Sequence, residues 1–243
     1  MNNEIINDLR DTYSELFANE RHFTYLYGSQ AYCIPKSASD LDLVTVVDEI
    51  NPSKLKLILE YVIEVHKKYD LEIDNEVPHH RKLITTLDMM SGAVEGRGFH
   101  YETGRVIIPE LKKTKEYLLS DELMYRLLLN TITGKSLFIS GDESLFYEYK
   151  DEGWDTMFKV IYNMHNQSLT VPEFVERMIG NCGREGESYM GYKNKPLIRR
   201  YLEEEVSRRL ESYHKKGLLT IEEERGYKPK YNSFMILPKW KVQ

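Results

Sequence analysis

The sequence predicts an α+β (α/β) fold with a short mixed β-sheet flanked by helices, followed by a mainly helical C-terminal domain. Two segments are predicted as strands: 23–27, which is rich in aromatic and β-branched residues, and 39–47, which ends in a β-branched run. Apolar residues at helical spacing precede and follow these segments, over residues 5–16 and 55–65. Beyond about residue 110 the apolar spacing is mainly helical. We therefore expect one domain over residues 1–110 and a second, mainly helical one over 111–243.

The individual elements follow from their flanking residues. A strand over residues 69–78 is predicted after the helix that Asn51-Pro52-Ser53 precedes, because apolar and acidic residues alternate there. Later helices are expected at four places: residues 118–128, 158–164, 172–179 and 197–214.

The composition is that of a globular protein. Of 243 residues, 41% are hydrophobic and 30% are charged, and no apolar run approaches the roughly eighteen residues of a membrane helix. Residues 1–4 lack the pattern of a signal peptide, and the two cysteines, Cys33 and Cys182, do not indicate a disulfide framework. We expect a cytoplasmic protein without membrane contact. The net charge of −6 disfavours broad binding to a polynucleotide backbone and is compatible with a small substrate or a locally basic protein.

Two carboxylates, Asp40 and Asp42, stand at the start of the second predicted strand. Side chains alternate along a strand, so both carboxylates are expected on one face. Like charges placed side by side repel one another unless a cation lies between them. Magnesium is the natural candidate, because it prefers hard oxygen ligands and usually binds together with substrate phosphates.

A Gly-Ser pair, Gly28-Ser29, directly follows the first predicted strand. Glycine allows the backbone to approach a ligand closely, and free N–H groups at the start of a helical turn favour an anion. A phosphate-facing turn shortly before a metal-binding acid pair is physically coherent. Each feature alone is more often an ordinary turn or a solvated strand start.

This combination resembles the nucleotidyltransferase superfamily that includes DNA polymerase β. The matching elements are Gly28-Ser29 and Asp40-Leu41-Asp42. The fuller pattern, Gly-Ser-x-Ala-Tyr followed by Ser-Asp-x-Asp, is especially similar to small, stand-alone bacterial and phage members. The resemblance covers roughly residues 22–77, less than a quarter of the chain, so it says nothing about acceptor choice.

The resemblance implies a third acidic residue on a later strand. Leu71-Glu72-Ile73 fits the expected hydrophobic-acid-hydrophobic pattern fully, and Ile73-Asp74-Asn75 fits it with a polar third position. We favour Glu72 and keep Asp74 as a near equal. An exposed acidic strand face is the alternative explanation for both residues.

The resemblance further implies a magnesium-dependent enzyme that moves a nucleoside monophosphate from ATP or another nucleoside triphosphate to an acceptor hydroxyl, releasing pyrophosphate. Two magnesium ions would serve the reaction. The implied catalytic and metal-binding residues are Asp40, Asp42, Glu72 and Asp74, and the implied nucleotide-binding residues are Gly28, Ser29 and Ser39. The acceptor, whether a small molecule, a protein or an RNA end, and the oligomeric state stay open.

Other functions also fit parts of the sequence. A catalytically silent nucleotide-binding or antitoxin-like module of the same fold is the main alternative. Arg209 and His214 have the spacing of HEPN-type ribonucleases, although such a pair arises easily by chance. The Gly134-Lys135-Ser136 run lacks the glycine that a phosphate-binding loop requires five residues earlier, where Leu129 stands.

Overall fold

The computed structural model describes residues 3–33, 40–73, 83–102, 105–107, 120–165, 168–179, 196–222 and 226–229. The helices are α1 (Asn3–Leu16), α2 (Gly28–Ala31), α3 (Pro52–Lys68), α5 (Leu87–Val94), α7 (Asp121–Thr133), α8 (Glu143–His165), α9 (Val171–Arg177) and α10 (Pro196–Lys215). The strands are β1 (His22–Tyr27), β2 (Asp42–Val47), β3 (Ile84–Thr86), β4 (His100–Glu102), β5 (Arg105–Ile107), β6 (Leu137–Gly141), β7 (Leu219–Glu222) and β8 (Gly226–Pro229). The mixed α and β composition predicted from the sequence is confirmed. Among the described residues, no helix is long and apolar enough to cross a membrane.

A four-stranded mixed sheet with the order β3-β2-β1-β6 organises the N-terminal half. Strand β1 pairs antiparallel with both β2 and β6, whereas β2 and β3 run parallel. The register places Phe23 opposite Val46 and Tyr27 opposite Asp42. The first two predicted strands are therefore present and adjacent, and β2 begins at Asp42.

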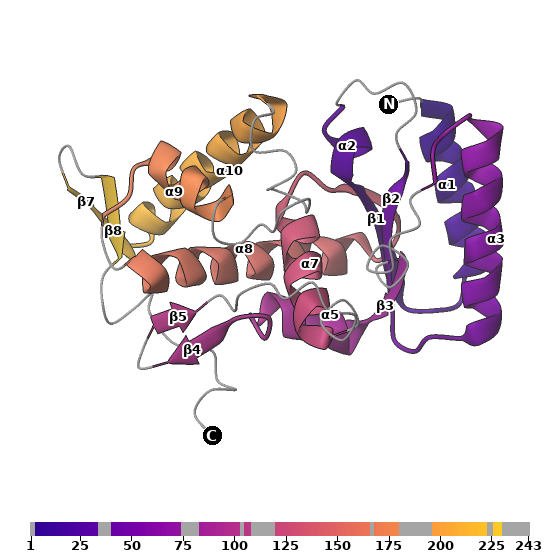
Figure 1. Ribbon diagram of the computed structural model, residues 1–243, viewed down its shortest axis with the longest axis horizontal. Helices are drawn as coiled ribbons and strands as arrows, with labels where there is room; N and C mark the ends of the chain where they lie inside the picture. The colour runs from indigo at the N-terminus through magenta and orange to yellow at the C-terminus, as the bar shows by residue number, and fades with distance from the viewer. Residues whose placement is uncertain are drawn as a thin grey trace.

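Helices cover both faces of this sheet (Figure 1). On one face, α1 and α3 enclose a core with apolar side chains of alternate strand positions, including Leu26, Leu41 and Leu43. On the other face, Tyr25 and Val44 join the core formed by α5, α7 and α8. This alternation is the period-two pattern expected of strands that are buried on both sides.

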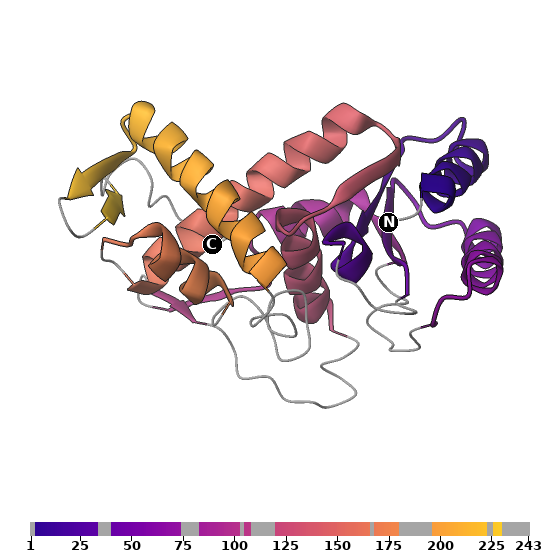
Figure 2. The same cartoon turned by 90° about the horizontal axis from the view of Figure 1, so that it is seen from above.

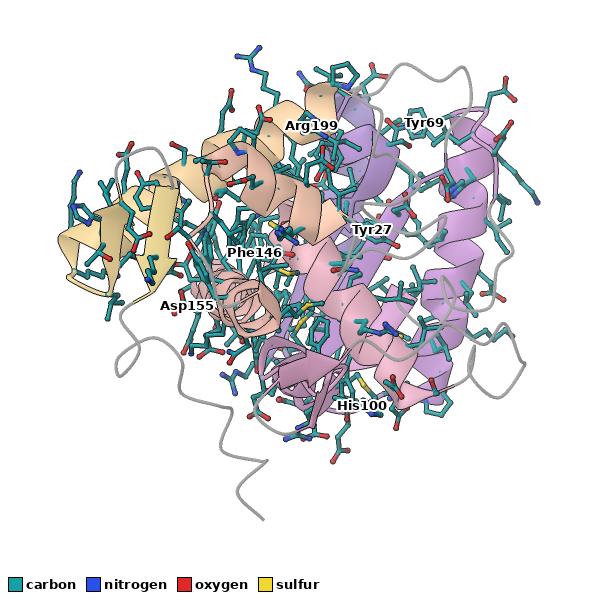
Figure 3. The ribbon with its side chains drawn as sticks, turned by 60° about the vertical axis from the view of Figure 1, so that its left-hand side comes forward. Tyr27, Tyr69, His100, Phe146, Asp155 and Arg199 are labelled. Carbon is teal, nitrogen blue, oxygen red and sulfur yellow. The ribbon has the colours of Figure 1, made fainter. Side chains whose placement is uncertain are left out.

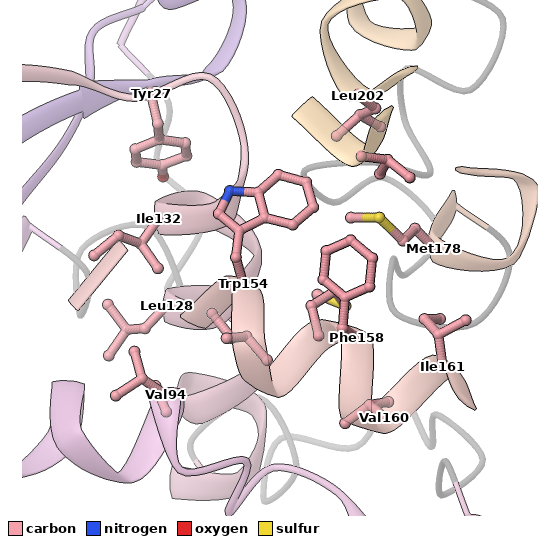
Figure 4. Packing of buried hydrophobic residues seen from close by; sticks show 14 of the residues in the cluster. Tyr27, Val94, Leu128, Ile132, Trp154, Phe158, Val160, Ile161, Met178 and Leu202 are labelled. Atoms are coloured by element: carbon pink, nitrogen blue, oxygen red, sulfur yellow. The ribbon is translucent and has the colours of Figure 1, made fainter. Parts of the chain in front are cut away.

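Helix α8 connects the sheet to the remaining helices. Seen from above, it runs along the middle of the molecule from the sheet toward the β7–β8 hairpin, with α9 and α10 beside it (Figure 2). Trp154 and Phe158 lie at its centre and are fully buried, and in Figure 4 Trp154 lies between Tyr27 and Phe158. Met178, directly after α9, and Leu202 of α10 complete this core.

The sheet and the larger core combine residues from both sides of the predicted boundary near residue 110. Strand β6 pairs with β1 from a position more than a hundred residues later in the chain. The same buried cluster includes Tyr27 of β1 and Leu210 of α10. The division into domains 1–110 and 111–243 stays a prediction, and in the structure the two parts share this core.

Candidate functional site

The Gly28-Ser29 turn and the acid pair meet at one end of the central strands. Tyr27, the last residue of β1, pairs with Asp42, the first residue of β2. Gly28 follows with a φ of +71°, in the left-handed region that favours glycine. A Cβ atom on Gly28 would lie 1.9 Å from Oδ2 of Asp42. The carboxylate of Asp42 therefore rests on the backbone of the glycine turn, in space that only a glycine leaves open.

Asp40 and Asp42 both act on the hydroxyl of Tyr27. Burial raises the pKa of Tyr27 well above its ordinary value, and the charge of Asp42 is the next cause. The charges of Tyr25 and Asp40 and a hydrogen bond with Asp42 raise the same pKa further. A hydroxyl beside a carboxylate donates to it, so Tyr27 holds the Asp42 side chain. Both carboxylates therefore interact with the Tyr27 hydroxyl, Asp42 through a hydrogen bond and Asp40 through its charge.

The acid pair belongs to the sheet face that the later helices cover. Val44 and Val46 pack into the core with α7 and α8, and Asp42 shares their side of the strand by alternation. Leu41 has the opposite orientation and lies in the core with α1 and α3. Figure 3 shows Tyr27 between Phe146 of α8 and Tyr69 at the end of α3. Asp40 and Asp42 are each partly buried.

The strand predicted over residues 69–78 is wrong for residues 69–73, the part of it that the structure describes. Helix α3 ends at Lys68, and Leu71 donates its backbone N–H to His66 O at 2.8 Å. Residues 71–73 then run without regular structure, and Glu72 is exposed. An exposed segment can show the same alternation of apolar and acidic residues: Ile73, one of the apolar residues, is 41% exposed.

The strand that follows α3 and pairs with β2 is β3, which consists of Ile84, Thr85 and Thr86 and has no carboxylate. Asp74 and Ser39 lie outside the described residues. Among the described residues, no three side chains of His, Cys, Asp or Glu gather closely enough to hold a metal ion. The placement of Glu72 or Asp74 beside the acid pair stays a prediction.

Ser29 is the second residue of α2 and is only 1% exposed. A phosphate can reach its hydroxyl only if the structure around the turn opens. Its assignment to the nucleotide stays a prediction, as does that of Ser39.

The end of α2 packs against the C-terminal helices through two tyrosines. The rings of Tyr32 and Tyr201 meet edge to face with their centroids 5.7 Å apart. Lys135 donates its backbone N–H to the Tyr32 hydroxyl at 3.0 Å, and the Tyr201 hydroxyl donates to Gly134 O at 3.1 Å. Helix α10 and the turn after α7 therefore lie directly against the glycine turn's helix.

Lys150 of α8 joins the same cluster. Its ammonium donates to Ser136 Oγ at 2.7 Å and to Gly134 O at 3.3 Å. Burial lowers the pKa of Lys150 to about 8 from an ordinary value of 10.5, against the opposing influence of the Glu205 charge. Nothing in the local sequence marks this lysine, because its partners come from another segment.

The Lys150 shift predicts a pH-dependent stability. The pKa of Lys150 is about 8 in the folded protein and 10.5 in the unfolded chain, so between these pH values the unfolded chain binds more protons. Below pH 8 the buried charge of Lys150 therefore lowers the free energy of unfolding. This destabilisation is lost as the pH rises from 8 to 10.5. Lys150→Met is therefore expected to increase the free energy of unfolding at pH 7 by about 1–3 kcal/mol. Urea unfolding at several pH values measures the effect.

The exposed neighbour Lys135 supplies the control, since Lys135→Met should leave stability nearly unchanged. Buried tyrosines titrate in every variant, so the difference between variants isolates Lys150. An advantage of Lys150→Met that does not shrink between pH 8 and pH 10 would contradict the assignment.

Arg209 and His214, the pair with ribonuclease-like spacing, each contact other parts of the fold. Arg209 is buried, bonds Asp151 Oδ1 at 2.6 Å and lies over the ring of Trp154 at 5.2 Å. His214 Nδ1 lies 3.1 Å from Leu219 O, at the start of β7. Five residues turn a helix by roughly 140° beyond a full circle, so the two side chains leave α10 on different faces.

The chain matches no family model, no curated protein and no solved structure.

Proposed function

We propose that this protein is a magnesium-dependent nucleotidyltransferase that moves a nucleoside monophosphate from a nucleoside triphosphate to an acceptor, releasing pyrophosphate. The observation that carries the proposal is the contact between the Asp42 carboxylate and Gly28, where a β-carbon would lie 1.9 Å from Oδ2. It brings together the two sequence features that make the resemblance, the glycine turn and the acid pair.

The donor set fits a hard divalent cation. Both groups are carboxylates, both are partly buried, and the charges of both raise the pKa of the Tyr27 hydroxyl. Two such charges repel one another, and a cation between them removes that cost. Two protein carboxylates also suit magnesium, which commonly keeps its other positions for phosphate oxygens and water.

Each residue has a stated role in the proposed reaction. Asp40 and Asp42 hold the metal, and Tyr27 holds Asp42 through its hydroxyl. Bound magnesium would lower the pKa of the acceptor hydroxyl and neutralise charge on the leaving pyrophosphate. Gly28, Ser29 and Ser39 are the proposed contacts to the nucleotide.

A third carboxylate, Glu72 or Asp74, would accept the proton of the acceptor, because a general base must lie within hydrogen-bond distance of the proton that it removes. Glu72 is exposed in the segment that follows α3. No covalent intermediate on the protein is needed.

A catalytically silent nucleotide-binding module is the second candidate. The observation that favours it is that β3, the strand that follows α3 and pairs with β2, consists of Ile84, Thr85 and Thr86 and supplies no third acid. Such a module would still bind a nucleotide at the glycine turn but would transfer nothing.

Transfer of label from radioactive nucleotides separates these functions. Purified protein is incubated with each of the four α-³²P-labelled nucleoside triphosphates, magnesium and fractions of cell extract that contain small molecules, protein or RNA. The enzyme places label on one of these fractions, and it loses this activity when the metal is chelated. Nucleotide binding without any labelled product would indicate the silent module, and the absence of both would refute the proposal.

A further inference from the structure

A buried histidine of α3 contacts the backbone between the two carboxylates. His66 is 3% exposed, and its Nε2 accepts the backbone N–H of Leu41 at 3.0 Å. Its Nδ1 lies 2.6 Å from the backbone oxygen of Val62, one turn earlier in the same helix. Leu41 stands between Asp40 and Asp42, so this hydrogen bond links α3 directly to the acid pair.

The partners determine which nitrogen of His66 carries the proton. A backbone N–H can only donate and a carbonyl oxygen can only accept. The neutral ring with its proton on Nδ1 satisfies both Leu41 and Val62, whereas the other neutral form satisfies neither. His66 is therefore a specific hydrogen-bond acceptor for Leu41 as well as a space-filling side chain.

The two carboxylates depend on different supports. Asp42 belongs to β2, where pairing with Tyr27 fixes its backbone. Asp40 precedes the strand and has no place in the ladder. The N–H that His66 accepts belongs to the peptide unit joining Asp40 to Leu41. His66 therefore restrains the backbone at Asp40, as strand pairing restrains the backbone at Asp42.

The side chain of Leu41 strengthens this restraint. It is 5% exposed and packs in the core with α1 and α3, while Asp42 points to the other side of the strand. The amide of Leu41 is thus bonded to α3, and its side chain lies in the core that α1 and α3 cover. This arrangement orients the flanking carboxylates away from α3 before any cation binds.

From this geometry we infer that His66 is a positioning residue of the metal site and acts through the Leu41 amide without contacting metal or nucleotide. The inference rests on the proposed function, because it assigns to Asp40 and Asp42 the role of metal ligands. Replacing a residue that orients metal ligands without touching the metal commonly lowers metal affinity by about 10- to 100-fold.

Two substitutions separate hydrogen bonding from packing. His66→Gln provides an amide oxygen that can accept the Leu41 N–H, and His66→Leu fills the space without an acceptor. His22→Leu is the matched control, since His22 is also buried, at 4% exposure, and its ring nitrogens contact Glu20 O and Ser140 Oγ. His22 lies at the opposite end of β1 from Tyr27.

The experiment measures Mn²⁺ affinity by electron paramagnetic resonance, in the presence of a non-hydrolysable nucleotide. It also measures hydrogen exchange of the Leu41 amide in the metal-free protein. His66→Leu is expected to weaken Mn²⁺ binding by about 10-fold or more and to accelerate Leu41 exchange. His66→Gln should keep both values within about threefold of the original protein, and His22→Leu should leave both unchanged.

Faster Leu41 exchange in His66→Leu with unaltered Mn²⁺ affinity would overturn the inference and leave the proposed function intact. Equal losses in folded His66→Gln and His66→Leu would also overturn it, because the acceptor would then not matter. If the unmodified protein binds no Mn²⁺, the proposed function fails, and the positioning role fails with it.

Discussion

Asp42→Asn is expected to reduce nucleotidyl transfer by at least about a thousand-fold while the protein stays folded. Asparagine has nearly the size of aspartate, so it still fits against Gly28, but it removes the charge that binds the metal. Losing several kcal/mol of charge stabilisation corresponds to a rate change of about this size. Stability should be equal or higher, because the repulsion with Asp40 is relieved. Initial rates with saturating magnesium and urea unfolding test both parts.

The same strand offers a matched control at its other end. Asp48 follows β2 and is exposed, so Asp48→Asn changes the net charge by the same amount away from the glycine turn. It should leave the rate within about twofold, because an exposed charge far from the site is screened by solvent. Full magnesium-dependent activity in Asp42→Asn would refute the assignment of Asp42 as a metal ligand.

Gly28→Ala is expected to abolish transfer and to destabilise the protein. The new methyl group would lie 1.9 Å from Oδ2 of Asp42, so the carboxylate must leave its position. The left-handed backbone at φ +71° costs an L-residue a further ~1–2 kcal/mol of stability. The free energy of unfolding should therefore fall by more than the backbone strain alone, and activity should be lost together with the position of the carboxylate.

Gly217→Ala measures the backbone strain by itself. Gly217 has a φ of +74° and lies at the exposed turn after α10. It should lose about 1–2 kcal/mol without loss of transfer. The Asp42→Ala background isolates the clash, because there the stability cost of Gly28→Ala should fall toward that of Gly217→Ala. An unchanged cost would show that Asp42 does not occupy the space beside Gly28.

The local parts of this fold could be predicted from the sequence because their signals are contiguous. The run 23–27 and the run 43–47 are each buried strands, and their common end brings Gly28 and Asp42 together without any distant element. Helix α9 begins at its Thr170 cap, with Pro172 in its first turn, as proline placement predicts. The stripe of α1 likewise matches its buried residues.

The parts that depend on distant partners could not be predicted. Strand β6 is five residues long and is stabilised by β1, more than a hundred residues away. Helix α8 extends from Glu143, well before the apolar spacing at 158–164 that indicated it, because charged and aromatic residues obscure the stripe in its first half. His66 contacts Leu41 across 25 positions, and nothing in the spacing of α3 distinguishes it from an ordinary histidine.

The strand predicted to carry the third carboxylate could not be established from the sequence pattern alone. Alternation at 71–77 is compatible with a strand and with an exposed segment, and only burial distinguishes the two. Leu71 packs against the core but Ile73 is substantially exposed, so the segment lacks the continuous packing that stabilises a strand. A family pattern of three residues cannot supply that information.

The central claim is that Asp40 and Asp42 bind a divalent cation beside the glycine turn. The most direct measurement is anomalous diffraction from crystals of the protein grown with Mn²⁺ and a non-hydrolysable nucleoside triphosphate. We expect an anomalous peak at about 2.0–2.2 Å from a carboxylate oxygen of each residue, with the nucleotide phosphates at Gly28. A nucleotide bound elsewhere, or manganese bound without Asp42, would contradict this claim.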